Sequence, residues 1–164
     1  MIVLGVDPAL SKTGWAIVQW NGKRKVKLLA SGLIKTKPKE EIPDRLLAIF
    51  EQFSTAACEH WNVDVCAIEN TIFVKAGADA AIKLGAARGV IYLCAAIFGL
   101  PVFQYHPPTI KKEVAGHGRA GKDDVQDAVR KTLKLTSTQQ EDEADATATA
   151  LCYLVKEHGY ILDS

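Results

Sequence analysis

With 164 residues, 48% of them hydrophobic and 24% charged, the chain has the composition of a soluble globular protein and not of a disordered one. We expect a single domain, residues 1–164, with enough chain to bury a sizeable core. The sequence shows no apolar run of transmembrane length and no N-terminal secretory signal. We therefore expect a cytoplasmic protein without a membrane partner.

The four cysteines do not form a metal or disulfide pattern. Cys58, Cys66, Cys94 and Cys152 are scattered, with no CxxC pair and no histidine at zinc spacing. Because each has apolar neighbours, we expect buried thiols that pack as small hydrophobic side chains.

The charges are segregated along the chain, although the formal net charge is only +1. Residues 8–39 contain no Asp or Glu but eight basic residues: Lys12, Lys23, Arg24, Lys25, Lys27, Lys35, Lys37 and Lys39. A second basic group lies between Lys111 and Lys134, and acidic residues concentrate at 40–41 and 141–145. This pattern is typical of a polyanion-binding surface beside an acidic, metal-dependent site, with a solvated basic face as the alternative.

The N-terminal residues predict a meander whose first strand ends in a carboxylate. Residues 2–6 are apolar and rich in β-branched side chains, Asp7 follows them, and Pro8 cannot continue a strand ladder. An acid at the tip of a central strand needs a metal ion or a basic partner, unless it is a solvated turn residue. Asn21-Gly22, between the apolar runs 15–20 and 26–34, predicts a hairpin with a two-residue type I′ turn.

A second strand also ends in an acid. Asp44 is a candidate N-cap for a helix that reaches about residue 60, and an apolar strand at 63–68 leads to Glu69. A helix between two strands favours a parallel crossover, which would place this strand beside the first. Asp7 and Glu69 would then lie near each other, at the sheet end where open α/β sheets bind ligands.

Residues 78–98 predict a long helix with few charges. A loop at 70–77 precedes it, and the tip of that loop, residues 72–74, is apolar. Ala81, Gly85 and Gly89 recur every four residues and would let another helix approach closely. Because an almost entirely apolar helix is buried on more than one side, we expect a two-fold symmetric homodimer, with burial inside one domain as the alternative.

The last third predicts one short strand and three helices, with the strand at 102–105 and the helices at 109–115, at 122–135 and from about 141 onward. The glycine-rich loop 116–121 lacks the spacing and the terminal Lys-Ser/Thr of a nucleotide-binding P-loop. Asp142 and Asp145 share a face at the start of the last helix, whose small residues suit packing flat on a sheet. Acids at a helix start are also ordinary partners of the helix dipole.

Four acids from separate elements could supply oxygen ligands to a metal ion. Two of them, Asp7 and Glu69, end strands, and the other two, Asp142 and Asp145, lie on a helix expected to pack on the sheet. Such hard ligands suit Mg²⁺ or Mn²⁺, which keep open positions for water and phosphate. Two ions roughly 3.5–4 Å apart would activate a water and stabilise the leaving 3′ oxygen of a phosphodiester.

The chain resembles the RuvC family of Holliday junction resolvases, within the RNase H-like nuclease superfamily. The resemblance covers nearly the whole length and implies an α/β fold. The sheet would be a mixed five-stranded one, an antiparallel meander followed by parallel strands, with helices on both faces. Five ordered motifs carry it: Leu4-Gly5-Val6-Asp7-Pro8, Ala67-Ile68-Glu69, residues 80–90, Pro101-Val102-Phe103 and Asp142-Glu143-Ala144-Asp145-Ala146.

The resemblance also implies roles for single residues. The residues that match the family's metal-binding catalytic carboxylates are Asp7, Glu69, Asp142 and Asp145. Lys111 and Lys122 match basic residues that contact DNA phosphate near the cut, and Phe73 or Ile72 takes the place of a residue that wedges into the junction centre. Further expected DNA contacts are Lys12, Lys75 and Arg119.

The activity that the resemblance implies is that of a homodimeric crossover-junction endodeoxyribonuclease with metal ions as its cofactor. It would use two Mg²⁺ ions per site, with Mn²⁺ as a substitute, and nick opposing strands of four-way DNA junctions in recombination and repair. A branch-migration complex is a candidate partner.

Two features depart from the bacterial pattern: Ala9 stands where Gly is usual, and the hairpin tip at 23–27 is unusually basic. They leave open a divergent or viral member that cuts branched nucleic acids more broadly. A catalytically silent junction-binding protein is a further alternative, although a dead site has no chemical reason to keep four repelling acids. Residues 7–14 also resemble the phosphate loop of actin-like sugar kinases, but those need two such domains, which 164 residues cannot supply.

Overall fold

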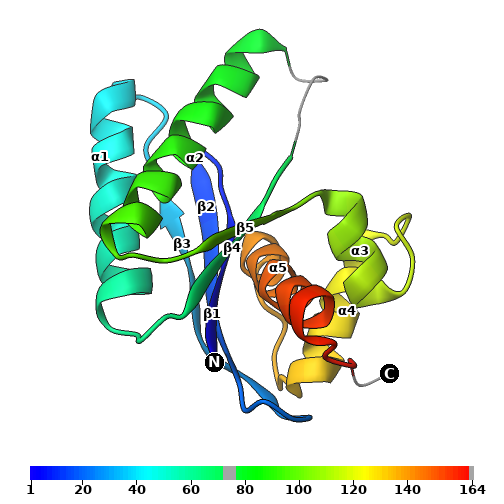
Figure 1. Cartoon of the computed structure of the whole chain (residues 1–164). Coiled ribbons are helices and arrows are strands. Elements are labelled where there is room, and N and C mark those ends of the chain that lie inside the picture. The colour runs from blue at the N-terminus through cyan, green and yellow to red at the C-terminus, as the bar shows by residue number, and fades with distance from the viewer. Residues whose placement is uncertain (72–76, 163–164) are drawn as a thin grey trace.

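Five strands form one mixed sheet in the spatial order β3-β2-β1-β4-β5 (Figure 1). The computed structural model describes residues 1–71 and 77–162, apart from the side chain of Cys58. The first three strands are antiparallel neighbours and the last two continue parallel to β1, as predicted. The strands are β1 (Ile2–Asp7), β2 (Lys12–Trp20), β3 (Val26–Lys35), β4 (Val65–Glu69) and β5 (Val102–Tyr105).

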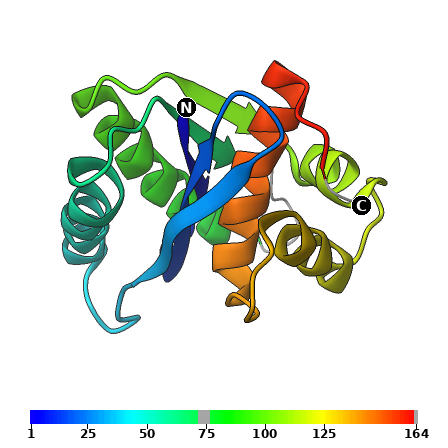
Figure 2. The same cartoon turned by 90° about the horizontal axis from the view of Figure 1, so that it is seen from below.

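Helices cover both faces of the sheet, as predicted (Figures 1 and 2). Because alternate side chains of a strand point to opposite faces, Leu4 and Val6 of β1 pack with the first two helices, while Val3 packs with the last three. Each face therefore has its own core. The helices are α1 (Ile42–Phe53), which continues into a π-helical segment (Ser54–Glu59), α2 (Ala78–Ile97), α3 (Pro107–Ala115), α4 (Lys122–Leu133) and α5 (Glu141–His158).

The helix α5 lies directly on the sheet because its inner face carries small side chains. Ala146 and Ala150 are fully buried. A Cβ atom on Gly5 of β1 would overlap the carbonyl oxygen of Ala146, so the helix approaches the strand more closely than any side chain would allow. This packing fixes the position of the acidic first turn of α5 relative to the strand ends.

The predicted two-residue turn between β2 and β3 is wrong. Trp20 pairs with Val26, so the connecting loop contains residues 21–25. Gly22 has a positive φ of 78°, which the Asn-Gly signal anticipates. The side-chain oxygen of Asn21, however, accepts hydrogen bonds from the backbone N–H groups of Lys23 and Lys25 at 3.0 and 3.2 Å. This side-chain cap stabilises a wider loop.

Two helices begin earlier than predicted because proline is accepted in the first turn of a helix. The N-cap of α1 is Glu41, and Asp44 lies in the first turn instead of capping it. The helix α3 begins at Pro107, two residues before the predicted start. Proline removes no hydrogen bond at these positions, because the first N–H groups of a helix have no partner within it.

The helix α2 is not buried on all sides by the described residues, which contradicts the alternative of burial inside one domain. One of its faces packs on α1 and the sheet and buries Ile91. The other face exposes Ile82 (71%) and Leu93 (55%), and a Cβ atom on Gly85 or Gly89 would meet nothing within 4 Å. Contrary to our expectation, α2 is also long and apolar enough to cross a membrane, with a mean hydropathy of 1.6 and 22% of the apolar window buried.

Three of the four cysteines are confirmed as buried: Cys66, Cys94 and Cys152. Burial raises the pKa of the Cys152 thiol to about 12, so this thiol stays protonated at neutral pH. The side chain of Cys58 lies outside the described part of the chain.

Candidate active site

Asp7 and Glu69 lie at the same end of neighbouring strands. Strands β1 and β4 pair in parallel with Val6 opposite Ile68, so the next residue of each strand carries the carboxylate. The strand β1 ends at Asp7, immediately before Pro8, and both carboxylates are partly buried. The register therefore brings the two strand-end acids together, as predicted.

The first turns of α5 bring a second pair of acids to this end of the sheet. Gly14 of β2 lies opposite Asp7 in the β1–β2 ladder. A Cβ atom on Gly14 would overlap the backbone carbonyl group of Asp142, so α5 sits directly against β2 at this point. Asp145 lies one turn further along the same face of the helix. The four predicted carboxylates thus come from β1, β4 and α5.

Burial and mutual repulsion raise the pKa values of two of these carboxyl groups. The pKa of Asp7 rises from 3.8 to about 8, first because burial disfavours the charged form and then because Glu69, Asp145 and Asp142 carry like charges. The pKa of Asp145 rises to about 6, mainly through burial and through the charge of Glu69. The four acids therefore form one electrostatic cluster that favours a proton or a cation.

Three lysines border this cluster. Lys12 Nζ forms an ion pair with Asp142 Oδ2. The charge of Lys122 opposes the rise in the pKa of Asp7 and of Asp145, and Lys111 acts on Asp145 in the same sense. These are three of the residues predicted to contact DNA, and their positions give the acidic cluster a basic rim.

The neighbouring acids of α5 point elsewhere. Glu141 forms an ion pair with Lys122, and Glu143 accepts a hydrogen bond from Ser31 Oγ at 3.1 Å. Of the acids at the start of α5, Asp142 and Asp145 are those that act on the pKa of Asp7.

With the side chains in these conformations, the carboxylates do not form a complete set of ligands for one metal ion. Within residues 1–71 and 77–162, no three Asp, Glu, His or Cys side chains converge closely enough to hold one metal ion. Charges interact over longer distances than a metal–ligand bond spans, so the pKa shifts do not conflict with this finding. Two of the acids have local partners, since Thr71 Oγ1 donates to Glu69 Oε1 at 2.6 Å and Lys12 pairs with Asp142.

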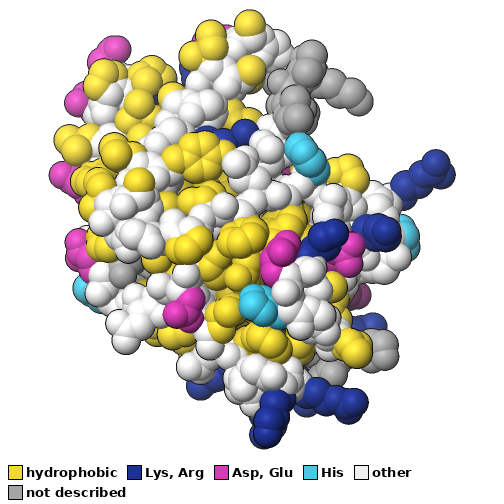
Figure 3. All heavy atoms as spheres, in the orientation of Figure 1, with side chains coloured by type: hydrophobic (Ala, Val, Ile, Leu, Met, Phe, Trp, Pro, Cys, Tyr) yellow, Lys and Arg dark blue, Asp and Glu magenta, His cyan; other side chains and the backbone are white. Residues whose placement is uncertain are grey.

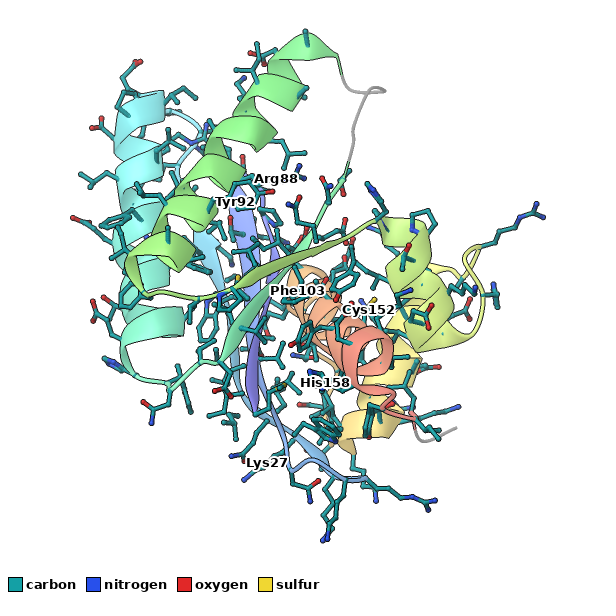
Figure 4. All side chains as sticks on the ribbon, viewed as in Figure 1. Lys27, Arg88, Tyr92, Phe103, Cys152 and His158 are labelled. Atoms are coloured by element: carbon teal, nitrogen blue, oxygen red, sulfur yellow. The ribbon has the colours of Figure 1, made fainter. Side chains whose placement is uncertain are left out.

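Arg88 of α2 holds the segment that follows Glu69, a role that the sequence analysis missed (Figure 4). Its guanidinium donates to the side-chain oxygen of Asn70 at 2.9 Å and to the carbonyl oxygens of Thr71 and Glu69 at 3.1 and 3.5 Å. His106 Nδ1 lies 2.9 Å from the carbonyl oxygen of Asn70. One signal was available, because Arg88 is one of three charged residues in an otherwise apolar helix.

Of the remaining predicted DNA contacts, the structure describes Arg119 alone. Arg119 lies exposed in the loop between α3 and α4. Ile72, Phe73 and Lys75 belong to residues 72–76, outside the described residues, so the choice between Ile72 and Phe73 as the wedge stays a prediction.

Acids lie at the ends of the central strand and of its parallel neighbour, and a further pair lies on a helix that packs on the sheet. Together with the strand order, this arrangement defines an RNase H-like fold. Residues 3–153 match the family described as crossover junction endodeoxyribonuclease RuvC. The chain belongs to this family.

Known proteins similar to this chain fall into close and distant groups. Proteins named crossover junction endodeoxyribonuclease RuvC from Saccharophagus degradans and Trichlorobacter lovleyi are 44% and 41% identical to it, over 93% and 94% of this chain and 87% and 85% of their own lengths. The structure of Thermus thermophilus RuvC in complex with a Holliday junction substrate superposes with a TM-score of 0.90 at 31% identity, over 97% of this chain and 96% of that chain. The fowlpox virus Holliday junction resolvase, with a TM-score of 0.57 at 16% identity over 96% of this chain and 99% of that chain, shares the fold alone.

Proposed function

We propose that this protein is a structure-selective endonuclease that nicks opposing strands of four-way DNA junctions by phosphodiester hydrolysis, in homologous recombination and DNA repair. The observation that carries the proposal is the cluster of Asp7, Glu69, Asp142 and Asp145 at one sheet end, in a chain of the RuvC family. An acidic cluster by itself repels DNA phosphate, so this activity requires a cation between the two.

We propose Mg²⁺ as that cation, with Mn²⁺ as a substitute and two ions in each active site. The donor chemistry supports this, because four carboxylates offer the hard oxygen ligands that both ions prefer. The raised pKa values of Asp7 and Asp145 belong to groups that a divalent cation would stabilise in their charged form. Such ions, when bound, activate water and stabilise the leaving oxygen of an in-line displacement.

The lysines of the rim support a role in binding the scissile strand. Lys111 and Lys122 lie close enough to influence Asp145, and they would neutralise the phosphate that approaches the acids. A metal ion bound to Asp142 would replace Lys12 there, and the Lys12 ammonium group could then bind a phosphate. Arg119 and Lys75 would extend the contact along the backbone. These contacts give affinity that falls with salt, while junction shape and a few base contacts decide where the cut falls.

We propose that the exposed face of α2 pairs with the same face of a second copy in a two-fold dimer. The large apolar side chains of Ile82 and Leu93 need cover, and Gly85 and Gly89 leave room for a closely approaching helix. A protein partner suits this face better than lipid, because the opposite face of α2 packs on α1 and its first turns carry the ion pair between Asp79 and Lys83. A dimer would bring two active sites to the two equivalent strands of a junction.

The setting of the activity follows from the proposed substrate. We place the protein in the cytoplasm beside the nucleoid, or in the host cytoplasm for a viral member, with a branch-migration complex as a partner. Two other functions remain alternatives: a nuclease for a broader range of branched nucleic acids, and a catalytically silent junction-binding protein.

Strand-by-strand cleavage of a synthetic four-way junction in Mg²⁺ tests the proposal, with matched linear duplex, Y-fork and flap substrates as controls. We expect paired symmetric nicks in the junction alone, and none with Asp7→Asn. Cutting of all branched forms would favour the broader nuclease. Tight binding of the junction by the wild-type protein without any cutting would favour the silent binding protein.

A further inference from the structure

Five basic side chains gather at the opposite end of the sheet from the acidic cluster. Lys23, Arg24, Lys25 and Lys27 come from the β2–β3 hairpin, and Lys134 follows the last residue of α4; we name these five the distal basic surface. All five are exposed. Figure 3 shows Lys and Arg side chains along this lower edge of the molecule, and Figure 4 labels Lys27 there.

The distal basic surface surrounds a hollow that no acid lines. A pocket of about 420 Å³ lies between the hairpin and the end of α4, and its lining includes four of the five basic residues together with Gln19 and Asn21. Within the described part of the chain, no carboxylate lies within ion-pair distance of any of the five basic groups. No direct ion pair offsets their mutual repulsion, and a bound polyanion would relieve it.

The backbone of the hairpin is held in place while its cationic groups stay free. Trp20 Nε1 donates a hydrogen bond to the carbonyl oxygen of Lys23 at 2.6 Å, and the Tyr160 hydroxyl donates to that of Arg24 at 3.5 Å. The Trp20 ring also packs against His158 and Tyr160, with ring centroids 5.4 and 6.5 Å apart. A ligand would therefore order only the ends of flexible side chains, which keeps the entropic cost of binding small.

The separation of the two sites follows from the elements that connect them. The strand β2 begins at Lys12, beside the acidic cluster, and ends at Trp20, beside the hairpin loop. Its nine residues span roughly 26–30 Å at about 3.3 Å per residue. The helix α4 runs in the same sense, from Lys122 at the rim of the cluster to Lys134 at the distal end. At about 3.4 Å per base pair, this separation corresponds to roughly eight base pairs of duplex.

We propose that the distal basic surface binds the phosphate backbone of a duplex arm, roughly eight base pairs from the cut. This inference rests on the proposed function, because it takes the arm from a junction held at the acidic cluster. The geometry favours a backbone over a small phosphate ligand. The charges come from a hairpin and a helix end and are spread along an edge, whereas a small anion needs donors that converge on one point.

The test compares four-way junctions with arms of about 7 and about 20 base pairs, the short arms closed by hairpin loops so that they stay paired. The triple variant Lys23→Gln/Arg24→Gln/Lys25→Gln removes three charges from the surface. Lys37→Gln/Lys39→Gln/Lys156→Gln removes three exposed charges elsewhere and is the matched control. The dissociation constants are measured at several salt concentrations in an Asp7→Asn background, and the single-turnover cleavage rates in the otherwise wild-type protein with Mg²⁺.

We expect the hairpin variant to bind the long-armed junction about tenfold more weakly than the control does, and the short-armed junction equally well. The slope of log K against log salt should become shallower by about 0.9 for each lost phosphate contact. The cleavage rate at saturating protein should not change. Equal weakening on both junctions, or no weakening on the long one, would overturn the inference.

The two proposals fail in different ways. A wild-type protein whose binding depends on arm length but which cuts no junction would overturn the proposed function and keep this inference. A protein that cuts junctions symmetrically, and whose binding ignores both arm length and the hairpin charges, would overturn this inference alone.

Discussion

Gly14 of β2 leaves room for the backbone of Asp142, because a Cβ atom at position 14 would overlap the Asp142 carbonyl group. The strand position opposite Asp7 therefore also sets the position of the first turn of α5. The positions of Asp142 and Asp145 therefore depend on the lack of a side chain at Gly14.

Gly14→Ala should push the start of α5 away from the sheet and lower the junction cleavage rate by about 10²-fold or more, as expected when catalytic groups move by about 1 Å. Junction binding should change much less, because the basic rim remains. Gly121→Ala is the control, since its Cβ would lie at an ordinary distance of 3.4 Å from Asp124 Oδ2. Full activity of Gly14→Ala in single-turnover assays would contradict this dependence.

Arg88 should act as a positioning residue for Glu69. Lysine cannot reproduce the fork of hydrogen bonds to Asn70 and Thr71, so Arg88→Lys should lower kcat by about tenfold while junction affinity stays near the wild-type value. Lys83→Gln removes another α2 cation, one paired only with Asp79 on the surface, and should leave kcat unchanged. Equal kcat values for the two variants would argue against the positioning role.

Without metal, the stability of the protein should fall as pH rises through the pKa of Asp7. The pKa of this group is raised from 3.8 to about 8 in the folded state, so the folded protein binds a proton that the unfolded chain releases. The resulting stabilisation is complete below about pH 4 and is lost as pH rises through about 8.

Asp7→Asn should remove this pH dependence. The variant and the wild type should unfold at similar temperatures near pH 4, whereas near pH 9 the variant should be more stable. A gain on the order of 2 kcal/mol would raise Tm by roughly 4–8 °C in a chain of this size. Saturating Mg²⁺ should reverse the order by stabilising the wild type more than the variant. If calorimetry gives the same difference in Tm between the variant and the wild type across this pH range, Asp7 does not titrate as described.

A charge on the exposed face of α2 should break the proposed dimer. Leu93→Asp should give a monomer in analytical ultracentrifugation, because two copies of the buried charge would meet near the two-fold axis. Leu47→Asp of α1 is a matched control, since both leucines are 55% exposed, and it should remain dimeric. A monomeric wild type, or a dimeric Leu93→Asp, would place the dimer interface elsewhere or remove it.

The protein should be more stable with valine in place of Thr132. Its side chain is 96% buried, being 4% exposed, and its hydroxyl has no hydrogen-bond partner within the described residues. Thr132→Val should therefore raise the free energy of unfolding by about 1 kcal/mol. Thr147→Val should lower it by a similar amount, because the Thr147 hydroxyl donates to the Glu143 carbonyl oxygen at 2.7 Å and accepts from Gln139 at 3.0 Å. Denaturant unfolding of both variants compares the two cases.

The sequence by itself determined the elements whose signals are local. An apolar β-branched run stopped by Pro8 identifies the strand that carries Asp7, and a helix between two strands implies the parallel pairing that brings Glu69 beside it. The three-residue spacing of Asp142 and Asp145 places both acids on one face of α5, whatever that helix packs against. These patterns act over a few residues, so they can be read without knowledge of the fold.

Only the tertiary structure decided the features that depend on distant contacts. The hairpin loop is wider because the Asn21 side chain caps it. Arg88 supports Glu69 because the fold brings this residue of α2 within hydrogen-bond distance of Asn70. The sequence pattern showed that α2 is apolar, but not that one face would stay uncovered within the chain. Whether a side chain is covered, capped or crowded depends on residues tens of positions away, and no local periodicity encodes those contacts.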